Sequence, residues 1–386
     1  MSEAESSVTV RFAPSPSGRL HVGNVRIALL NWLLAKKAGG RFLLRFDDTD
    51  VERSREEYVR MAEEDLNWLG LVWDEEMRQS TRLDLYRKAA EKLKATDRLY
   101  PCYETPEELA LKRKMLLSKG KPPIYDRAAL HLDAAALRKF EAEGRVPHWR
   151  FRLEEGAIRW MDGVRGDVTF EAGNISDPVL IRADGTPLFI LPSVVDDMDL
   201  KVTDVLRGED HVTNTAVQIQ IFEALGAKPP RFAHLPLLTD IRGGGLSKRE
   251  ESLSIAELRE EGVEPMALNS LLALIGSSDP VAPFASLDAL LPNFDLQKFA
   301  RATPKFDQDE LASVNAKLLH GLPFSDVAER LRGLGLEGVD EAFWLAVREN
   351  LMRLSDAAAW WRVCHGEITP IVEDAAFMRE AAALLP

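Results

Sequence analysis

The chain has 386 residues, of which 46% are hydrophobic and 29% charged, as is typical of a globular protein with room for two or three domains. No apolar run approaches membrane-spanning length, and the acidic start MSEAESS lacks the apolar core of a signal peptide, so we expect a cytoplasmic protein without a membrane partner. A formal net charge of -13 argues against indiscriminate nucleic-acid binding but allows a local basic face. The two distant cysteines, Cys102 and Cys364, give no disulfide framework.

The first predicted elements are a strand over residues 8–12, a proline-rich loop and an amphipathic helix over 25–38. His21, Gly23 and Asn24 stand immediately before this helix, where unpaired backbone amides and the helix dipole attract anions. This position favours phosphate contacts for His21 and Asn24. Taken singly, the two residues also fit an ordinary loop histidine and a helix N-cap.

A second buried strand is predicted over 41–46 and ends in the acidic run DDTD. Carboxylates after a strand suit a metal site, a helix cap or a binder of an amine, and Asp50 is placed to cap a helix over 53–69. A strand-like piece over 70–73 and a helix over 79–93 continue the alternation. This order predicts a doubly wound parallel sheet with its ligands at the carboxyl ends of the strands. Neither common glycine-rich nucleotide motif, G-x-G-x-x-G after a strand or G-x-x-x-x-G-K-[ST], is present.

From residue 99 the pattern changes to a charged helical run and then to short antiparallel strands, expected over 149–170. Asp184 and Gly185 mark a hairpin turn between two further strands, and residues 188–197 return to the main sheet as a buried helix or strand. The cations of the helical run suit a solvated helix face or, with a nucleic-acid partner, phosphate contacts. These cations are Lys112, Arg113, Lys114, Lys119 and Lys121.

A further parallel strand is predicted over 202–206, and a helix follows over 213–225. The polar residues between them are Arg207, Glu209, Asp210 and His211. Because this is again the carboxyl end of a strand, Arg207 suits a ligand pocket. A structural ion pair with Glu209 or Asp210 is the alternative.

Three consecutive glycines lie in the loop 239–252, and Ser247, Lys248 and Arg249 follow them. Beyond Ser254 the sequence is predominantly helical. Its last tryptophans, expected in the core rather than as base-stacking platforms, are Trp344, Trp360 and Trp361.

Five stretches occur in an order and at a spacing that resemble the glutamyl-tRNA synthetases of bacterial type, which are class I aminoacyl-tRNA synthetases. They are RFAPSPSG, HVGN, FDDTD, RGEDHVTNTAVQIQIFEALG and LSKR. HVGN resembles the HIGH signature with Asn24 in place of its second histidine, and the LSKR segment resembles the KMSKS loop with Gly245 in place of its first lysine.

The resemblance implies an α/β fold, with a Rossmann-like doubly wound parallel sheet and an inserted α+β domain that binds the tRNA acceptor end. All-α stem-contact and anticodon-binding regions would follow, the last of them incomplete. The implied domains are 1–98 and 188–252 for the two halves of the catalytic domain, 99–187 for the insert, 253–323 for the stem-contact domain and 324–386 for the anticodon-binding region.

The implied reaction joins L-glutamate to the 3′ end of tRNA through a glutamyl-adenylate, with ATP and Mg²⁺ and without a protein nucleophile. The resemblance assigns catalysis to His21, Asn24 and Lys248. It assigns ATP binding to His21, Gly23, Asn24, Asp210, His211, Leu238, Ser247 and Lys248. It assigns glutamate binding to Arg11, Ala13, Ser15, Asp47, Phe189, Ser193 and Arg207. The two arginines would meet the side-chain carboxylate, for which a planar guanidinium is well suited, and Asp47 would meet the α-ammonium.

Some members of this family hold zinc in the insert through cysteines. Here Cys102 is followed by Tyr103 and Glu104, and one thiolate cannot satisfy a tetrahedral sulfur-rich site, so we expect no zinc and no metal held by the protein. The expected partners of a monomeric enzyme are L-glutamate and tRNA-Glu, with tRNA-Gln as a second candidate.

Two alternatives remain open at this stage. One is a shorter relative that glutamylates a modified tRNA base, which the helical region from Phe324 onward disfavours. The other is a paralogue that binds tRNA or a partner without ligating, which Gly245 and the early end of the chain favour.

Overall fold

The computed structural model describes residues 7–246, 254–366 and 375–384. At its centre lie five strands, which are β1 (Thr9–Phe12), β2 (Arg41–Phe46), β3 (Glu75–Arg78), β9 (Asp204–Gly208) and β10 (Arg231–Leu235). β2 pairs in parallel with both β1 and β3, and β9 pairs in parallel with β10. The two sets adjoin where the amide of Thr203 donates to the carbonyl of Thr9 at 2.9 Å. The order β3-β2-β1-β9-β10 confirms the predicted doubly wound arrangement.

Five helices cover this sheet, namely α1 (Val22–Lys37), α2 (Glu56–Trp68), α3 (Leu83–Ala95), α6 (Ile190–Asp199) and α7 (Val212–Ala224). α1 begins at Val22, three residues before the predicted start, so Gly23 and Asn24 belong to its first turn. The prediction of an amphipathic helix was wrong, because α1 lies between β1 and the later helix α9 (Pro265–Leu274) and is buried on most of its circumference.

A hairpin from the middle of the chain extends the central sheet. β6 (Ala157–Asp162) and β7 (Gly166–Glu171) pair antiparallel, and Asp162 at the end of β6 is in register with Phe232 of β10. This hairpin confirms the expected antiparallel strands, and it brings residues of the middle segment beside the carboxyl end of β10.

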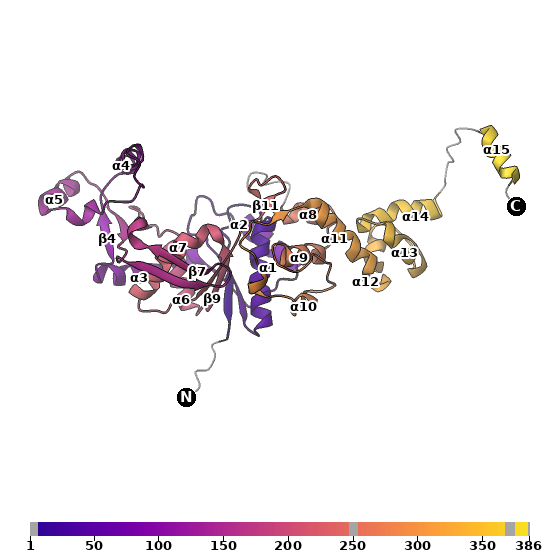
Figure 1. Cartoon of the computed structure of the whole chain (residues 1–386), viewed down its shortest axis with the longest axis horizontal. Helices are drawn as coiled ribbons and strands as arrows, with labels where there is room; N and C mark the ends of the chain where they lie inside the picture. Colours follow the sequence, from indigo (N-terminus) through magenta and orange to yellow (C-terminus); the bar gives the residue numbers. More distant parts are fainter. Residues whose placement is uncertain (1–6, 247–253, 367–374, 385–386) are drawn as a thin grey trace, which may run out of the picture.

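A second, antiparallel sheet is formed by β4 (Leu99–Cys102), β5 (His148–Phe151) and β8 (Val179–Ile181). Helices α4 (Pro106–Ser118) and α5 (Ala134–Ala142) lie beyond it, at the left end of the molecule in Figure 1. The predicted hairpin at Asp184 and Gly185 is a tight turn, but only the single bridge between Ile181 and Pro187 follows it, and α6 begins at Ile190.

From Ile255 onward the described chain is mainly helical and extends to the side opposite α4 and α5 (Figure 1). Its helices besides α9 are α8 (Ile255–Glu260), α10 (Leu287–Leu290), α11 (Gln308–Gly321), α12 (Phe324–Gly333), α13 (Glu341–Val347), α14 (Ala357–His365) and α15 (Ala375–Leu384). The two-residue strands β11 (Thr239–Asp240) and β12 (Lys305–Phe306) pair in parallel. One hydrophobic core joins α1 and β2 to α9 and α11, a second fills the space around α3, α6 and α7, and a third lies among α12 and α13. The predicted domain boundaries stay predictions.

Several local predictions were wrong. The third strand is Glu75–Arg78 rather than 70–73. α2 begins at Glu56 without a side-chain cap, because Asp50 instead pairs with Arg53. Trp344 is fully buried as expected and Trp361 packs on the third core, but Trp360 is 39% exposed, since α14 presents that side of its surface to solvent. No helix within the described ranges has the length and apolar character required to cross a membrane.

Candidate active site

Buried charged side chains meet at the carboxyl ends of the central strands. Arg11 comes from β1, Arg45 from β2 and Arg207 from β9, and each is at most 6% exposed. Asp197 of α6 lies among them and is 3% exposed. Parallel strands end at one edge of their sheet, so side chains from residues 11 to 207 are brought into one site.

Arg11 and Arg45 share Asp197. Arg11 Nε donates to Asp197 Oδ1 at 3.1 Å, and Arg45 Nη1 donates to the same oxygen at 2.8 Å. Arg45 also donates to both carboxylate oxygens of Asp47, at 2.7 and 3.2 Å, and to the hydroxyl of Ser193 at 3.3 Å. Burial by itself lowers the pKa of Arg45, but Asp47, Asp197 and Asp196 outweigh it and raise that pKa, so its guanidinium stays charged. The structure thus brings the predicted Arg11, Asp47 and Ser193 together around Arg45.

Asp196, the neighbour of Asp197, fixes α6 from its other side. Its carboxylate accepts hydrogen bonds from Gln79 at 2.9 Å, from Arg82 Nε at 2.8 Å and from the hydroxyl of Tyr86 at 2.9 Å. Asp196 is fully buried, so each of these donors offsets part of the free energy of removing the carboxylate from water. The segment from 79 to 86 therefore fixes the position from which Asp197 meets the arginines.

Arg207 differs from the other two arginines because its hydrogen-bond partners are neutral. Its Nε donates to His234 Nε2 at 3.2 Å, and its Nη2 donates to Thr215 at 2.5 Å and to Gln218 at 2.6 Å. Its Nη1 is buried without a hydrogen-bond partner. The alternative ion pair with Glu209 or Asp210 is not formed, since Glu209 pairs with Arg165.

Burial lowers the pKa of Arg207 to about 9, and the nearby charge of Arg11 adds to the effect while Asp197 and Asp210 oppose it. The guanidinium of Arg207 is thus buried with a lowered pKa, with one nitrogen that has no hydrogen-bond partner and with no anion bonded to it. An added carboxylate would restore its pKa and would satisfy Nη1.

The residues that follow β9 form the next part of the site. His211 stacks at an angle on Phe189, with ring centroids 5.3 Å apart, and its Nδ1 lies 3.1 Å from Asn214 Nδ2. Burial, reinforced by Arg207, lowers the pKa of His211 to about 4, so the ring is neutral near pH 7 despite Asp210 at 3.6 Å. Phe189 and His211 are thus neighbours. Their predicted contacts, Phe189 with glutamate and His211 with ATP, stay predictions.

His21 caps the N-terminus of α1. Its Nδ1 accepts from the amide of Gly23 at 3.1 Å, and the amide of His21 donates to Asn24 Oδ1 at 3.2 Å, which completes a capping box. A Cβ at Gly23 would lie 2.9 Å from Cε1 of His21, so any side chain there would displace the imidazole. The simpler interpretation was therefore wrong: His21, not Asn24, is the N-cap, and Asn24 is the third residue of the helix, at an N-terminus whose dipole favours an anion.

The remaining predicted residues have mixed positions. Ser15 is exposed and Ala13 half-buried in the loop after β1, whose Pro14 carbonyl accepts from the amide of Asp47 at 3.0 Å. The side chain of Leu238 lies in the first core. Ser247, Lys248 and Arg249 lie outside the described residues, so their predicted contacts with the triphosphate stay predictions.

Sequence reasoning missed Arg45, Asp197 and His234. Each stands within or at the end of a mainly apolar segment, RFLLRF, LFILPSVVDD and RFAHL respectively. A charged or titratable residue within an apolar run is the available signal, because such a side chain is buried only with compensating partners.

The segment in which some relatives hold zinc contains Cys102, Glu104 and Tyr125. The Tyr125 hydroxyl donates to Glu104 Oε1 at 2.8 Å and lies 3.7 Å from Cys102 Sγ, and burial raises the pKa of this thiol to about 12. Over the ranges 7–246, 254–366 and 375–384, no group of three or more His, Cys, Asp or Glu side chains is arranged to hold a metal ion. The expected absence of zinc stays a prediction.

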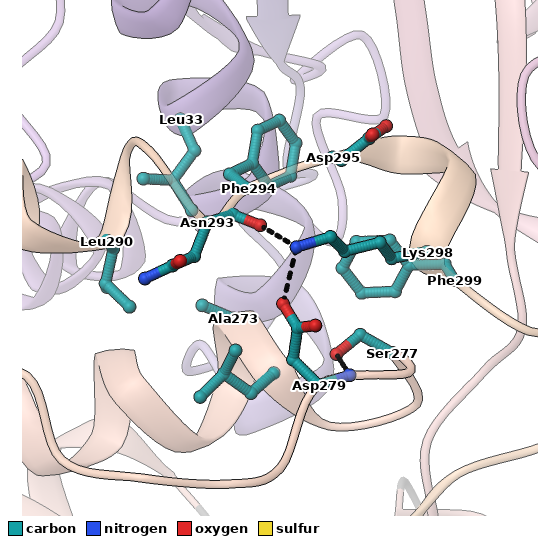
Figure 2. Close-up of a pocket in the computed structure, with 11 residues that line it drawn as sticks. Leu33, Ala273, Ser277, Asp279, Leu290, Asn293, Phe294, Asp295, Lys298 and Phe299 are labelled. Carbon is teal, nitrogen blue, oxygen red and sulfur yellow. Dashed lines mark hydrogen bonds and ion pairs between the residues drawn. The ribbon is translucent and has the colours of Figure 1, made fainter.

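Two cavities differ sharply in size. One of about 590 Å³ has Thr49, Tyr86, Lys94, Trp149 and Leu191 in its wall, and none of the described residues predicted to bind glutamate or ATP lines it. The other, in Figure 2, has a volume of about 10 Å³ around the ion pair between Lys298 and Asp279. That volume is at the lower limit for a single water molecule, so of these two cavities the first alone has room for a substrate.

Comparison with known proteins identifies the family of this chain. Residues 7–313 match the family model of the catalytic domain of class I tRNA synthetases (E and Q). The glutamate–tRNA ligase of Azospirillum brasilense is 58% identical over 98% of this chain and 85% of its own length, and glutamate–tRNA ligase 2 of Methylorubrum populi is 56% identical over 99% and 85%.

A solved structure of a glutamate tRNA ligase from Elizabethkingia meningosepticum in complex with its amino acid superposes with a TM-score of 0.86. It is 29% identical and covers 97% of this chain and 83% of that one. This chain therefore belongs to the glutamate–tRNA ligase family of class I tRNA synthetases.

Proposed function

We propose that the protein is an ATP-dependent ligase that joins L-glutamate to the 3′ end of tRNA-Glu through a glutamyl-adenylate, releasing pyrophosphate and then AMP. The names of the relatives support this proposal. The observation that carries it is Arg207, which is 6% exposed, has only neutral hydrogen-bond partners among the described residues and has an unpartnered Nη1.

The charges around Arg207 support an amino acid with a second carboxylate. Arg11, Arg45 and Arg82 each have an aspartate partner, whereas Arg207 has none. The side-chain carboxylate of glutamate would supply this missing anion, with Arg11 alongside. Glutamine offers only a neutral amide and would leave the buried charge unpaired, which is the kind of mismatch that gives strong discrimination.

The proposed chemistry requires positioning rather than a protein nucleophile. The α-carboxylate of glutamate attacks the α-phosphorus of ATP, and a ribose hydroxyl of the tRNA then attacks the adenylate. By holding the side-chain carboxylate, Arg11 and Arg207 leave the α-carboxylate free to react, while Asp47 is proposed to hold the α-ammonium. His21 and Asn24, at the N-terminus of α1, are proposed to contact the phosphates.

ATP would bring Mg²⁺ to this site, where the ion neutralises charge on the triphosphate. We assign the Mg²⁺ to the phosphate oxygens of ATP, because the described residues include no group of three or more His, Cys, Asp or Glu side chains placed to hold an ion. The proposed roles of Ser247 and Lys248 in the same subsite rest on the LSKR segment of the sequence.

The 590 Å³ cavity suggests how the tRNA end reaches the amino acid. Leu191 of α6 and Tyr86, whose hydroxyl bonds Asp196 of the same helix, line the cavity, so the cavity and the proposed glutamate pocket share α6. Lys94 Nζ lies 3.9 Å from the ring centroid of Trp149 in its wall, a pairing of cation and aromatic ring that suits an unpaired nucleotide. We propose that the 3′ end of the tRNA enters here and that the protein acts as a monomer.

The decisive experiment is ATP–pyrophosphate exchange with glutamate and with glutamine, each with and without tRNA, followed by charging of purified tRNA-Glu and tRNA-Gln. We expect exchange with glutamate alone among the two amino acids, and charging of tRNA-Glu. Absence of exchange under every condition would contradict the proposal, and charging of tRNA-Gln would widen the tRNA specificity.

A further inference from the structure

Nη1 of Arg207, which has no hydrogen-bond partner, points in a defined direction only if the rest of the guanidinium is fixed. Of the five N–H groups of an arginine, Nε carries one, and Nη1 and Nη2 carry two each. Nη2 is held by Thr215 and Gln218, and Nε is held by His234 alone. The orientation of Nη1 therefore depends on whether His234 Nε2 can accept a hydrogen bond.

His234 is fully buried, and its other ring nitrogen contacts Asp162. Nδ1 of His234 lies 2.5 Å from Asp162 Oδ2. Asp162 also accepts three backbone amides on Oδ1, from His234 at 3.0 Å, Arg165 at 3.0 Å and Val164 at 3.1 Å. Burial raises the pKa of a carboxylate, but the bonds from His234 and the amides outweigh it, so the pKa of Asp162 is lowered and the group is ionised.

An ionised carboxylate accepts hydrogen bonds and cannot donate them, so His234 Nδ1 must carry the proton. Burial lowers the pKa of His234, Arg207 and Arg165 add to the lowering, and the bonds with Asp162 oppose it. The ring is therefore neutral, with the proton on Nδ1 and a lone pair on Nε2. That lone pair faces Arg207 Nε at 3.2 Å and the Thr215 hydroxyl at 2.8 Å.

We propose that Asp162 and His234 are positioning residues for glutamate recognition. Asp162 holds His234 in its Nδ1-protonated tautomer, and the lone pair on His234 Nε2 in turn orients Arg207 so that Nη1 points into the pocket. The placement depends on the hairpin of β6 and β7, which extends the central sheet and brings Asp162 beside His234 of β10. This inference rests on the proposed function, because it assigns the glutamate carboxylate to Arg207.

The direct test is the variant Asp162→Asn. An asparagine can keep the three amide bonds on Oδ1, but its NH₂ group would face His234 Nδ1 and favour the Nε2-protonated tautomer. That tautomer turns an N–H toward Arg207, as happens when the aspartate of a Ser-His-Asp triad becomes asparagine. We expect the KM for glutamate to rise roughly tenfold to a hundredfold, while the KM for ATP stays within about twofold.

Three further variants separate positioning from simple structural damage. His234→Gln places an amide oxygen near the position of Nε2 and should recover much of the glutamate KM, whereas His234→Leu should not. Asp177→Asn is the matched control, because Asp177 is an equally buried carboxylate, 2% exposed, that accepts from Tyr100 and Arg127 away from the site. It should lower stability and leave the glutamate KM unchanged.

The tautomer can be measured without any activity. In ¹⁵N-histidine-labelled protein, which has seven histidines, the resonance missing from His234→Gln identifies His234, and its ring shifts report which nitrogen carries the proton. We expect Nδ1–H in the wild type and Nε2–H in Asp162→Asn. An Nε2–H or doubly protonated ring in the wild type, or an unchanged glutamate KM in Asp162→Asn, would overturn the inference. A wild type with the expected tautomer but no pyrophosphate exchange would instead overturn the proposed function.

Discussion

Arg11 and Asp197 are 186 residues apart in sequence, yet Nε of Arg11 donates to Oδ1 of Asp197 at 3.1 Å in a pair that is almost completely buried. Because Arg45 uses the same carboxylate oxygen, Asp197 links the first two strands to α6. The proposed glutamate pocket and the stability of the sheet edge therefore depend on the same carboxylate.

Asp197→Asn should destabilise the protein by about 3 to 5 kcal/mol, since it removes the negative charge between two buried arginines. Urea denaturation gives the free energy of unfolding. Asp199→Asn on the same helix is the control, because Asp199 is half exposed in its pair with Arg82 and its loss should change stability by less than about 1 kcal/mol. Equal losses in the two variants would contradict the role of Asp197.

Arg207→Lys should raise the KM for glutamate roughly tenfold to a hundredfold, because a lysine keeps the charge but lacks the planar fork of donors that reaches His234, Gln218 and a substrate carboxylate in fixed directions. Pyrophosphate exchange at varied glutamate measures the effect. Arg231→Lys, at an exposed position of the adjacent strand that pairs with Asp204, serves as the control and should behave as the wild type. A wild-type KM for Arg207→Lys would show that the carboxylate binds elsewhere.

The neutral state of His234 gives a pH dependence of stability. An unfolded histidine takes up a proton near pH 6.5, whereas the native ring, with its lowered pKa, does so only at lower pH. The unfolded state therefore binds more protons below about pH 6.5, and the stability contributed by neutral His234 is fully present above that pH and declines below it.

His234→Gln lacks this titration. The difference in free energy of unfolding between the wild type and this variant should shrink between pH 7.5 and 5.5, by at most about 1.4 kcal/mol per pH unit. Chemical denaturation at several pH values measures it. A difference that grows as the pH falls would mean that the native ring gains its proton more readily than the unfolded one.

Lys94→Gln should raise the KM for tRNA several-fold and weaken its salt dependence, because Lys94 and Trp149 form one wall of the proposed entry for the tRNA end. Aminoacylation at varied tRNA and salt concentrations measures both effects. Lys88→Gln, exposed on the same helix but not lining the cavity, is the matched control. Identical tRNA kinetics for the two variants would remove Lys94 from the path.

Asn315→Ala should loosen the attachment of the last helices. Asn315 is 2% exposed, accepts from the amide of Glu264 at 2.7 Å and donates to the carbonyl of Met352 at 2.8 Å. Its loss leaves the buried amide of Glu264 unpaired, at about 1 to 3 kcal/mol, and also removes the bond to the carbonyl of Met352, a residue that is 51% exposed. Hydrogen exchange should accelerate around 351–354, whereas the exposed Asn350→Ala should leave it unchanged.

The order of strands and helices, and the regions that contain the site, could be predicted from sequence because they depend on local patterns. The signal lies within a few residues in each of three places. They are the apolar run of β2, the alternation in the hairpin of β6 and β7, and His21 with Gly23 at the start of α1. Predicted boundaries were wrong where local side-chain hydrogen bonds decided them. α1 extends to Val22 because His21 caps it, and α2 starts at Glu56 because Asp50 pairs with Arg53 instead.

The tertiary structure alone decided which charges compensate one another. Arg11 and Arg207 could be assigned to a carboxylate pocket by resemblance, but only the fold shows that Arg11 already has Asp197 while Arg207 has neutral partners. The free energy of a buried charge depends on neighbours brought from distant parts of the chain, and those neighbours leave no local pattern in the sequence. For the same reason, the pairing of Asp162 with His234 could not be predicted from the sequence, because it depends on the hairpin lying beside β10.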